Sequence, residues 1–161
     1  MNKIKIKIRR VKKEVTDMLI DVKNRIEEPQ IQELLGYSIF PDPEQLDQAI
    51  AVYRADEATH LYVYESEERY VGIIGYRLDE HKVMHLLHLA VEPESRGVGF
   101  GRGILLETIA EFQPERIVTE TDEETVEFYR NVGFVINSLG EKYPGVERFQ
   151  CTYEVDEETD E

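Results

Sequence analysis

A glycine-rich stretch, AVEPESRGVGFGRG, covers residues 90–103 and holds four glycines within its last seven residues. An apolar run precedes the glycines, and an apolar helical pattern follows them. Glycine loses more conformational freedom on folding than any other residue, so the stretch indicates that something must approach bare backbone. Where a strand meets a helix, unpaired backbone N–H groups and the helix dipole attract anions. The stretch therefore predicts a site for a phosphate or another anionic group.

Two common phosphate-binding patterns do not fit this stretch. The pattern GxxxxGK[ST] is absent, because no Lys-Ser or Lys-Thr pair follows the glycines. The dinucleotide pattern GxGxxG also fails, since Arg102 stands where the third glycine after Gly97 and Gly99 is required. If the pattern is instead started at Gly99, Ile104 occupies the position of the third glycine. The dinucleotide motif also begins a parallel strand–helix–strand unit, whereas antiparallel strands are expected before this loop.

The remaining pattern, RGVGFG at residues 96–101, resembles the acyl-CoA loop [RQ]xxGx[GA] of the GNAT acetyltransferase superfamily. The longer segment LAVEPESRGVGFG is similar to the strand and loop motif of that family, and FYRNVGF at residues 128–134 resembles its second signature. The predicted order of elements is similar along nearly the whole chain. The resemblance implies one acetyltransferase domain over residues 1–155. It would move an acetyl group from acetyl-CoA to a primary amine by direct attack in a ternary complex.

The resemblance also implies which residues hold acetyl-CoA, the co-substrate. Loop amides would surround its pyrophosphate, and Arg96 and Arg102 would add charge-assisted bonds to phosphate oxygens. The pantetheine arm would pair with backbone at Leu89 and Val91, which requires the neighbouring strand to splay away. Asp122 stands where many members carry an Asn that contacts the coenzyme, and a carboxylate accepts but cannot donate a hydrogen bond. The expected cofactor contacts are Leu89, Val91, Arg96, Gly97, Val98, Gly99, Phe100, Gly101, Arg102 and Asp122.

Acetyl transfer to an amine requires one proton to leave the amine and another to reach the departing thiolate. Tyr129 matches the tyrosine that the family often uses as the general acid, and a phenol with a pKa near 10 can donate at neutral pH. The alternative interpretation is a core tyrosine that shares a helix face with Val126. The oxyanion donor is expected to be a backbone N–H at the strand end, at Val91.

The last strand before the glycines offers two histidines for the base. An imidazole has an ordinary pKa near 6.5, which suits proton uptake at neutral pH, directly or through water. His85 lies eleven residues before Arg96, a spacing at which the family often places a Glu or His base. Strict alternation would put His85 and His88 on opposite faces of the strand, so we expect only His85 to face the acceptor. A structural histidine is the alternative, and Glu92 and Glu120 are lesser candidates for the base.

The sequence contains no motif that is typical of metal-dependent or serine-nucleophile catalysis. The four histidines show neither HExxH nor Cys/His metal spacing, so we expect no metal. A GxSxG nucleophile elbow is also absent. Cys151 is the single cysteine, which excludes an internal disulfide, and we expect it to be a small core residue of the last strand.

The sequence does not identify the amine that accepts the acetyl group. In the family, helices corresponding to residues 16–53 and a hairpin corresponding to residues 135–150 usually wall the acceptor site. Carboxylates beside aromatic rings in these segments would suit a cationic amine, such as a polyamine, an aminoglycoside or a lysine side chain. A solvated helix surface explains the same residues equally well: Glu27, Glu28, Glu33, Tyr37, Phe40, Asp42, Glu44, Asp47 and Tyr143. The expected acceptor is therefore a small-molecule or peptide amine.

A second functional class also fits the glycine loop. A non-catalytic domain that binds or senses acyl-CoA would keep the loop without needing Tyr129 or His85. The presence of both residues therefore favours an enzyme. Dimers that form through the C-terminal strands are common in the family, so the resemblance also implies a homodimer.

Composition and charge limit the location and the partners. The chain has 161 residues, 41% of them hydrophobic and 33% charged, which is typical of one folded domain. Seven basic groups lie within residues 1–13, and the other 148 residues hold 12 basic and 34 acidic groups, a net charge of −22. Such a body repels nucleic acids and anionic membranes. Without an apolar run for a membrane span or signal peptide, and with one cysteine, we expect a cytoplasmic protein.

Periodicity predicts the elements that position these residues. Lysine and isoleucine alternate in KIKIKIRRV near the N-terminus, which predicts an edge strand with its lysines in water. Apolar residues at helical spacing predict a helix over residues 16–28 that Pro29 ends or disturbs. A second helix begins at Asp42 and Pro43, which form an N-cap and a first helical turn.

The second half of the chain alternates strands and helices. Strands are expected at residues 60–66, 70–78, 83–91 and 116–120, a helix from the glycines to residue 112, a short helix at 123–132, and a closing hairpin. Residues 156–161 form an acidic tail. The order βααβββαβαββ predicts an α/β (α+β) fold, with a mixed central sheet of about seven strands and helices on both faces.

Overall fold

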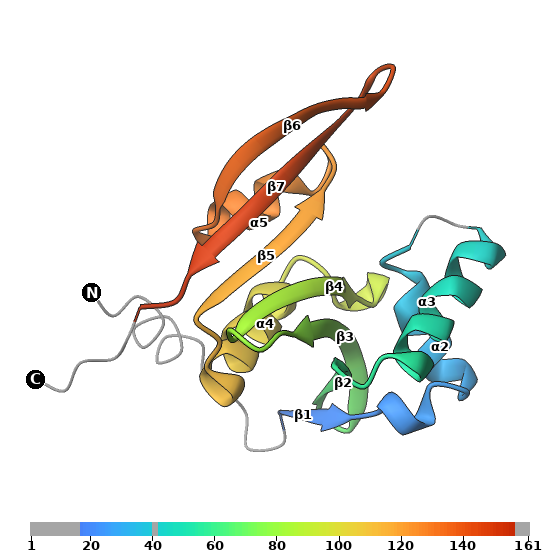
Figure 1. Cartoon of the computed structure of the whole chain (residues 1–161). Coiled ribbons are helices and arrows are strands. Elements are labelled where there is room, and N and C mark those ends of the chain that lie inside the picture. The colour runs from blue at the N-terminus through green and yellow to red at the C-terminus, as the bar shows by residue number, and fades with distance from the viewer. Residues whose placement is uncertain (1–16, 40–41, 157–161) are drawn as a thin grey trace, which may run out of the picture.

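The computed structural model describes residues 17–39 and 42–156, and these residues build one mixed sheet. Its seven strands follow the order β1-β2-β3-β4-β5-β7-β6, and all neighbouring pairs are antiparallel except β4 with β5 (Figure 1). The elements are β1 (Met18–Asp21), η1 (Lys23–Arg25), α2 (Pro29–Gly36), α3 (Pro43–Ala55), β2 (Thr59–Ser66), β3 (Arg69–Leu78), β4 (Val83–Val91), η2 (Pro93–Ser95), α4 (Phe100–Phe112), β5 (Arg116–Thr121), α5 (Val126–Val132), β6 (Val135–Tyr143) and β7 (Val146–Glu154).

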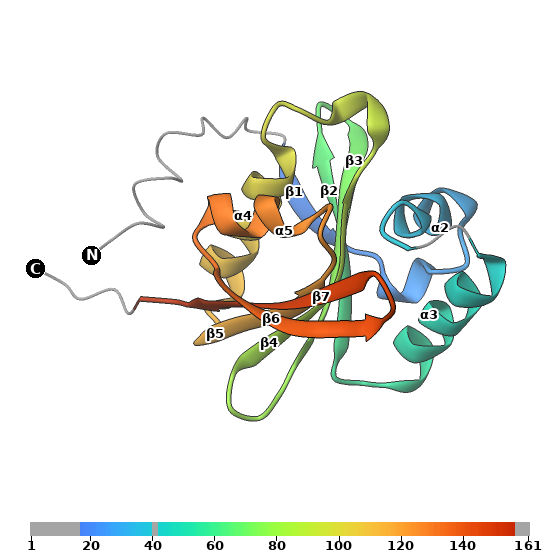
Figure 2. The same ribbon diagram turned by 90° about the horizontal axis from the view of Figure 1, so that it is seen from above.

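Helices cover both faces of the sheet, as the sequence predicts. Figure 2 shows α4 and α5 on one face and α2 and α3 on the other. Each face has its own buried core. Ile104 and Leu105 of α4 belong to the first core, and Ile31 and Leu35 of α2 belong to the second. The expected mixed sheet of an α/β fold is confirmed.

The central strands and the second helix lie where the sequence predicts them. The meander β2–β3–β4 starts and ends within one residue of the expected strands. Helix α3 begins at Pro43, and the Asp42 carboxylate accepts a hydrogen bond from the Glu44 amide at 3.0 Å. Alternating side chains with polar turns, and a capped proline start, are local signals, so they predict these elements well.

The expected helix over residues 16–28 is wrong. Residues 18–21 form β1, which pairs antiparallel with β2, and a 3-10 helix follows. Leu19 packs on the α4–α5 core and Ile20 on the α2–α3 core, an alternation that a strand permits and a single helix face does not. Pro29 begins α2 instead of ending a helix, because proline suits the first helical turn.

The order βααβββαβαββ nevertheless holds among the described residues, with its first strand and first helix later in the chain than expected. The strand expected at the N-terminal lysines lies outside the described residues, as does most of the acidic tail. Helix α5 is shorter than the predicted helix at 123–132, because it begins only at Val126.

Gly75 of β3 is expected to be required for stability. A Cβ atom at this position would lie 1.8 Å from the Tyr53 hydroxyl oxygen, and Tyr53 is fully buried. Gly75→Ala should therefore lower the free energy of unfolding by about 1–3 kcal/mol through overpacking. Urea unfolding followed by circular dichroism measures this change. Gly36→Ala is the matched control, because nothing lies within 4 Å of a Cβ there, and equal midpoints for both variants would contradict the prediction.

Candidate functional site

Strands β4 and β5 are paired over only part of their length. Their parallel register covers residues 83–85 of β4 and 116–118 of β5, and the two strands then diverge (Figure 1). The Thr119 hydroxyl donates to the Leu86 carbonyl at 3.1 Å, just beyond the last paired residues. The splay expected between these strands is confirmed, and it leaves a wedge-shaped gap at the C-terminal half of β4.

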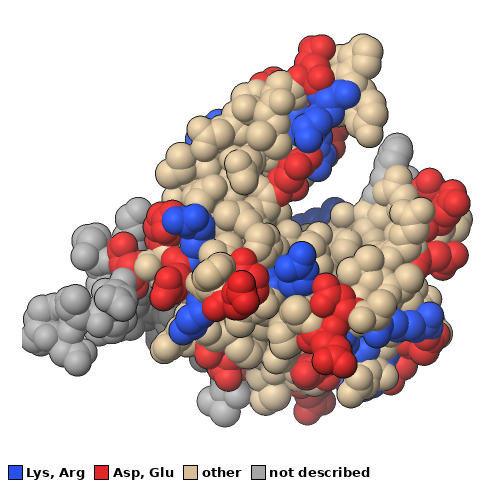
Figure 3. Space-filling model, in the orientation of Figure 1, with Lys and Arg blue, Asp and Glu red and all other residues tan. Residues whose placement is uncertain are grey.

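The backbone of β4 presents hydrogen-bonding groups to this gap. The Glu92 amide donates to the Val71 carbonyl of β3 at 2.9 Å. Because successive residues of a strand alternate, the backbone groups of Leu89 and Val91 point away from β3, toward the gap. The surface is hollowed between the β6–β7 end and the α2–α3 layer (Figure 3). An extended molecule could therefore pair with β4 like an added strand.

A bulge in β4 overturns the expected alternation of the two histidines. Gly75 of β3 pairs with His88, but the next residue, Tyr76, pairs with Leu86, so Leu87 is an extra residue. One extra residue reverses the side-chain alternation beyond it. His85 and His88 therefore lie on the same face of the sheet, the α2–α3 face, and the expectation that only one histidine can lie on that face is wrong.

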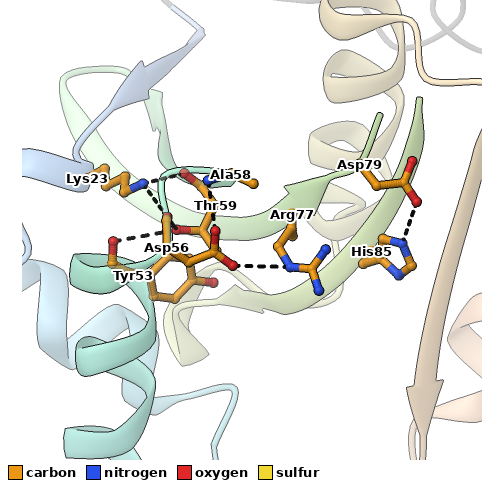
Figure 4. A network of polar contacts seen from close by, with 8 residues as sticks. All are labelled: Lys23, Tyr53, Asp56, Ala58, Thr59, Arg77, Asp79 and His85. Carbon is orange, nitrogen blue, oxygen red and sulfur yellow. Dashed lines mark hydrogen bonds and ion pairs between the residues drawn. The ribbon is translucent and has the colours of Figure 1, made fainter. Parts of the chain in front are cut away.

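His85 forms a pair with Asp79. Its Nε2 atom lies 3.1 Å from an Asp79 carboxylate oxygen (Figure 4). Backbone amides of His81 and Val83 also donate to that carboxylate. The bonds from His85 and then Val83 lower the pKa of Asp79 to about 2. Asp79 thus stays charged at neutral pH and orients the half-buried imidazole of His85.

His88 is bound to a buried tyrosine instead of a carboxylate. Its Nδ1 atom lies 2.7 Å from the Tyr53 hydroxyl. Burial lowers the pKa of His88 to about 4 and raises the pKa of Tyr53 above its ordinary value. Both side chains are therefore neutral at pH 7. The pair has the properties of a structural histidine on the face where α3 covers the sheet.

Tyr129 lies on the other face, at the closed end of the gap. The side chain is 6% exposed and packs between the rings of Phe128 and Phe134, each with centroids 5.1 Å away. Burial raises its pKa, so the phenol stays protonated at neutral pH. Tyr129 is therefore a neutral proton donor within the α4–α5 core.

The glycine loop has the backbone of an anion site. Gly97 and Gly99 have φ values of +86° and +94°, and α4 begins directly after Gly99. Nothing lies within 4 Å of a Cβ built at either glycine, so no contact inside the described chain requires their small size. The first amides of α4 have no partner within the helix, as at any helix N-terminus. Val98, between the two glycines, is 73% exposed.

The two arginines of the loop differ in their contacts. Arg96 donates from Nε to the Val91 carbonyl at 2.8 Å, and its guanidinium lies 5.8 Å from the centre of the Tyr37 ring. Arg102 forms no ion pair with any residue of the ranges 17–39 and 42–156. Arg96 thus ties the loop to the end of β4, whereas Arg102 has no carboxylate partner within these described ranges.

The three acidic candidates are already engaged. The Asp122 carboxylate accepts a hydrogen bond from the Thr125 amide at 3.0 Å, in the turn that precedes α5. Glu92 forms an ion pair with Arg69 and accepts from the Ser95 hydroxyl at 2.7 Å. Glu120 lies 2.9 Å from Arg148 Nε. Glu92 and Glu120 are therefore both held by an arginine, whereas His85 is paired with a carboxylate.

Within residues 17–39 and 42–156, no three or more His, Cys, Asp and Glu side chains are placed to hold a metal ion. The same part of the chain has no helix both long and apolar enough to cross a membrane. Cys151 is fully buried in the α4–α5 core, as the sequence predicts.

Sequence reasoning did not identify Asp79, Thr119 or Tyr53. Each of them joins residues that are distant in sequence or belong to different elements, so no motif contains them. Gly75 is an available signal, because a glycine inside a strand suggests a bulge or a close approach. The structure shows both there: the extra residue Leu87 follows directly in the register after the pair of Gly75 with His88, and the backbone of Gly75 lies against Tyr53.

A family model described as an acetyltransferase (GNAT) domain matches residues 24–146 of the chain. An uncharacterized N-acetyltransferase encoded in the lysA 3′ region of Bacillus methanolicus is 24% identical over 75 residues. That match covers 47% of this chain and 62% of the Bacillus protein, so the chain spans less than two thirds of the length of this curated relative.

Solved structures share the fold at low sequence identity. A protein of Desulfovibrio desulfuricans assigned to the GNAT family has a TM-score of 0.70 and 20% identity, over 86% of this chain and 99% of that one. An acetyltransferase from Elizabethkingia anophelis with acetyl-CoA bound has a TM-score of 0.66 and 15% identity, over 88% and 100%. The dodecameric spermidine N-acetyltransferase of Vibrio cholerae has a TM-score of 0.65 and 16% identity, over 88% and 95%.

Proposed function

The chain belongs to the GNAT acetyltransferase family, and we propose that it transfers an acetyl group from acetyl-CoA to a primary amine by direct attack in a ternary complex. One observation carries this proposal: the open edge of β4 leads directly into the glycine loop and the start of α4. A coenzyme with an amide-containing arm and a pyrophosphate needs both features side by side. The acetyl-CoA bound to the Elizabethkingia anophelis protein of similar fold supports this choice of donor.

Acetyl-CoA would lie along the gap with its phosphates at the loop. Loop amides and Arg102 would hold the pyrophosphate, because backbone N–H groups and a guanidinium favour phosphate oxygens. Backbone groups of Leu89 and Val91 would pair with the amides of the pantetheine arm. Pairing at Val91 requires the Arg96 side chain to release that carbonyl. Asp122 would contribute through the backbone, since its carboxylate already accepts a hydrogen bond from the Thr125 amide.

The two proposed proton transfers take place on opposite faces of the sheet. The amine nitrogen attacks the thioester carbonyl carbon, the C–S bond breaks, and the departing thiolate takes a proton from Tyr129 on the α4–α5 face. The proton lost by the amine leaves toward the α2–α3 face. His85 is the proposed acceptor for it, directly or through water, with Asp79 holding the imidazole. A backbone N–H at the end of β4 would stabilise the oxyanion.

His85→Ala is expected to lower kcat about 100-fold, because the amine then loses its proton acceptor. The fall should be greatest near neutral pH, so the pH–rate profile of the variant should differ in shape from that of the wild type. Rates between about pH 5 and 9 measure both effects. His81→Ala is the control, because His81 is highly exposed and lies outside the site. An unchanged pH–rate profile in His85→Ala would remove His85 from the mechanism.

A cationic acceptor such as a polyamine is the proposed substrate class. Several carboxylates of the expected acceptor wall already have partners: Glu27 pairs with Arg54, Glu28 with Arg25, and Asp42 caps α3. Glu33 accepts a hydrogen bond from Tyr37, beside the loop arginine Arg96. The Vibrio cholerae protein of the same fold acts on spermidine, which supports testing polyamines first.

Thiol release from acetyl-CoA, measured with a panel of primary amines, tests the proposed activity. The panel contains polyamines, aminoglycosides, amino acids, arylalkylamines and lysine peptides. Release of CoA that depends on one amine class would establish both the activity and the substrate class. Binding of acetyl-CoA without release on any of these amines would favour the alternative, a domain that binds or senses acyl-CoA.

Self-association of the chain stays a prediction. Strand β6 lies at the edge of the sheet, and Val135 and Tyr143 on it are 63% and 67% exposed. Large apolar side chains on an unpaired edge are typical of contacts between subunits. Light scattering on the purified chain would detect the expected homodimer, and a monomer at all concentrations would exclude it.

A further inference from the structure

A side chain closes the narrow end of the gap between β4 and β5. The last register pair of these strands joins His85 to Val118, and the next residues are Leu86 and Thr119. In place of a further pair, the Thr119 hydroxyl donates to the Leu86 carbonyl at 3.1 Å. Leu86 is buried and Thr119 is half-buried, so the bond is largely shielded from water. This hydrogen bond joins the two strands across the end of the gap, and we call it the Thr119 bridge.

The two strands separate directly beyond the Thr119 bridge (Figure 1). Leu87, which follows Leu86, is the extra residue of the bulge against β3, and a bulge bends its strand. The later residues of β4, all of which the structure describes, have no register pair with β5. The bridge therefore lies where the paired part of the two strands ends and the open edge of β4 begins.

The proposed orientation of acetyl-CoA brings its acyl group to this end of the gap. The phosphates would lie at the glycine loop, which follows β4, and the pantetheine arm would pair first with Val91 and then with Leu89. An arm that runs in this direction continues from Leu89 toward Leu87, so the thioester would lie beside the bulge. The acyl carbons are the terminal atoms of the arm, so they would lie next to the Thr119 bridge.

We propose that the Thr119 bridge limits the length of the acyl group, so that the site accepts acetyl-CoA and excludes acyl-CoA donors with longer chains. This inference rests on the donor site of the proposed function. A longer chain needs the volume that the Thr119 side chain fills, or it must separate the strands that the bridge joins. Separation breaks the bond and leaves the carbonyl of the buried Leu86 without its hydroxyl donor, which is costly. The methyl of an acetyl group avoids both costs.

Calorimetric titrations with acetyl-CoA and butyryl-CoA test the proposal without any amine. The wild-type chain should bind butyryl-CoA at least about tenfold more weakly than acetyl-CoA, as closed pockets do with a chain that is too long. Thr119→Ala removes the hydroxyl and the methyl group, so its two dissociation constants should agree within about threefold. Thr119→Ser keeps the hydroxyl, so this variant should still prefer acetyl-CoA as the wild type does.

Thr152→Ala is the matched control for Thr119→Ala. Thr152 of β7 pairs with Val118 on the side of β5 opposite to β4, so the same change is made away from the gap. This variant should keep the wild-type preference for acetyl-CoA. Turnover with the best amine of the panel gives a second readout, because the ratio of kcat/KM for the two donors should change in Thr119→Ala alone.

Equal affinity of the wild type for the two donors would overturn the inference, and this result requires no variant to fold. An unchanged preference in Thr119→Ala, or a lost preference in Thr119→Ser, would overturn it as well. If the wild type binds acetyl-CoA but acetylates no amine, the proposed activity fails, and the ratio of the dissociation constants still decides the role of the Thr119 bridge. If neither donor binds, the inference fails together with the donor site.

Discussion

Tyr129→Phe is expected to lower kcat about 100- to 10,000-fold, because it removes the proposed general acid. The dissociation constant for acetyl-CoA should stay within about twofold of the wild-type value, since the phenol acts on the departing thiolate and not on the bound thioester. Steady-state kinetics with the best amine of the panel measure the first quantity. Calorimetry with acetyl-CoA measures the second.

Tyr153→Phe is the matched control for this variant. Tyr153 lies in the same core, is equally buried, and packs on Phe134 with ring centroids 5.3 Å apart. Both variants remove one buried hydroxyl, so they should have similar stability, but only Tyr129→Phe should be slow. Equal turnover of Tyr129→Phe and the wild type would leave Tyr129 as a core tyrosine, the alternative that the sequence left open.

Gly99→Ala is expected to weaken acetyl-CoA binding at least about tenfold, which corresponds to about 1.4 kcal/mol. Gly99 has a φ of +94° and precedes the first turn of α4, where the phosphates are proposed to bind. A Cβ there meets no atom of the described protein, so its steric effect should fall on a ligand that approaches the backbone. Calorimetric titration with acetyl-CoA measures the loss.

Alanine at a positive φ also introduces backbone strain, which needs its own control. Gly145→Ala supplies it, because Gly145 has a φ of +78°, meets no atom within 4 Å of a Cβ, and lies between β6 and β7, far from the loop in sequence. Both variants should lose similar stability, but Gly145→Ala should bind acetyl-CoA like the wild type. Unchanged affinity of Gly99→Ala for acetyl-CoA would show that the loop glycines are needed only for the backbone conformation of the turn.

The parts of the fold that local patterns control could be predicted from the sequence. The strands of the meander alternate apolar and polar residues, and Asp42 with Pro43 marks a helix start, so β2, β3, β4 and α3 lie where expected. The prediction for residues 18–21 was wrong because their apolar spacing also fits a helix. Their strand conformation depends on hydrogen bonds to β2, more than 40 residues later in the chain.

The candidate site also has features that the sequence predicts and features that it does not predict. The glycine loop and the splay of β4 from β5 follow from a motif and from the family resemblance, so their positions were predictable. The bulge at Leu87 was not predictable, because one extra unpaired residue does not change the pattern of an apolar run. It moves His88 to the face of His85 and against Tyr53. The hydrogen bond from the Thr119 hydroxyl to the Leu86 carbonyl joins separate strands, and only tertiary structure brings them together.

Calorimetric titration of the full chain with acetyl-CoA tests the central claim most directly. The open edge of β4 and the loop at residues 96–101 predict saturable binding with one acetyl-CoA per chain. CoA should compete for the site, because the phosphates and the pantetheine arm provide most of the contacts. An absence of binding, with the chain shown to be folded by circular dichroism, would contradict the assignment of the loop and the activity proposed from it.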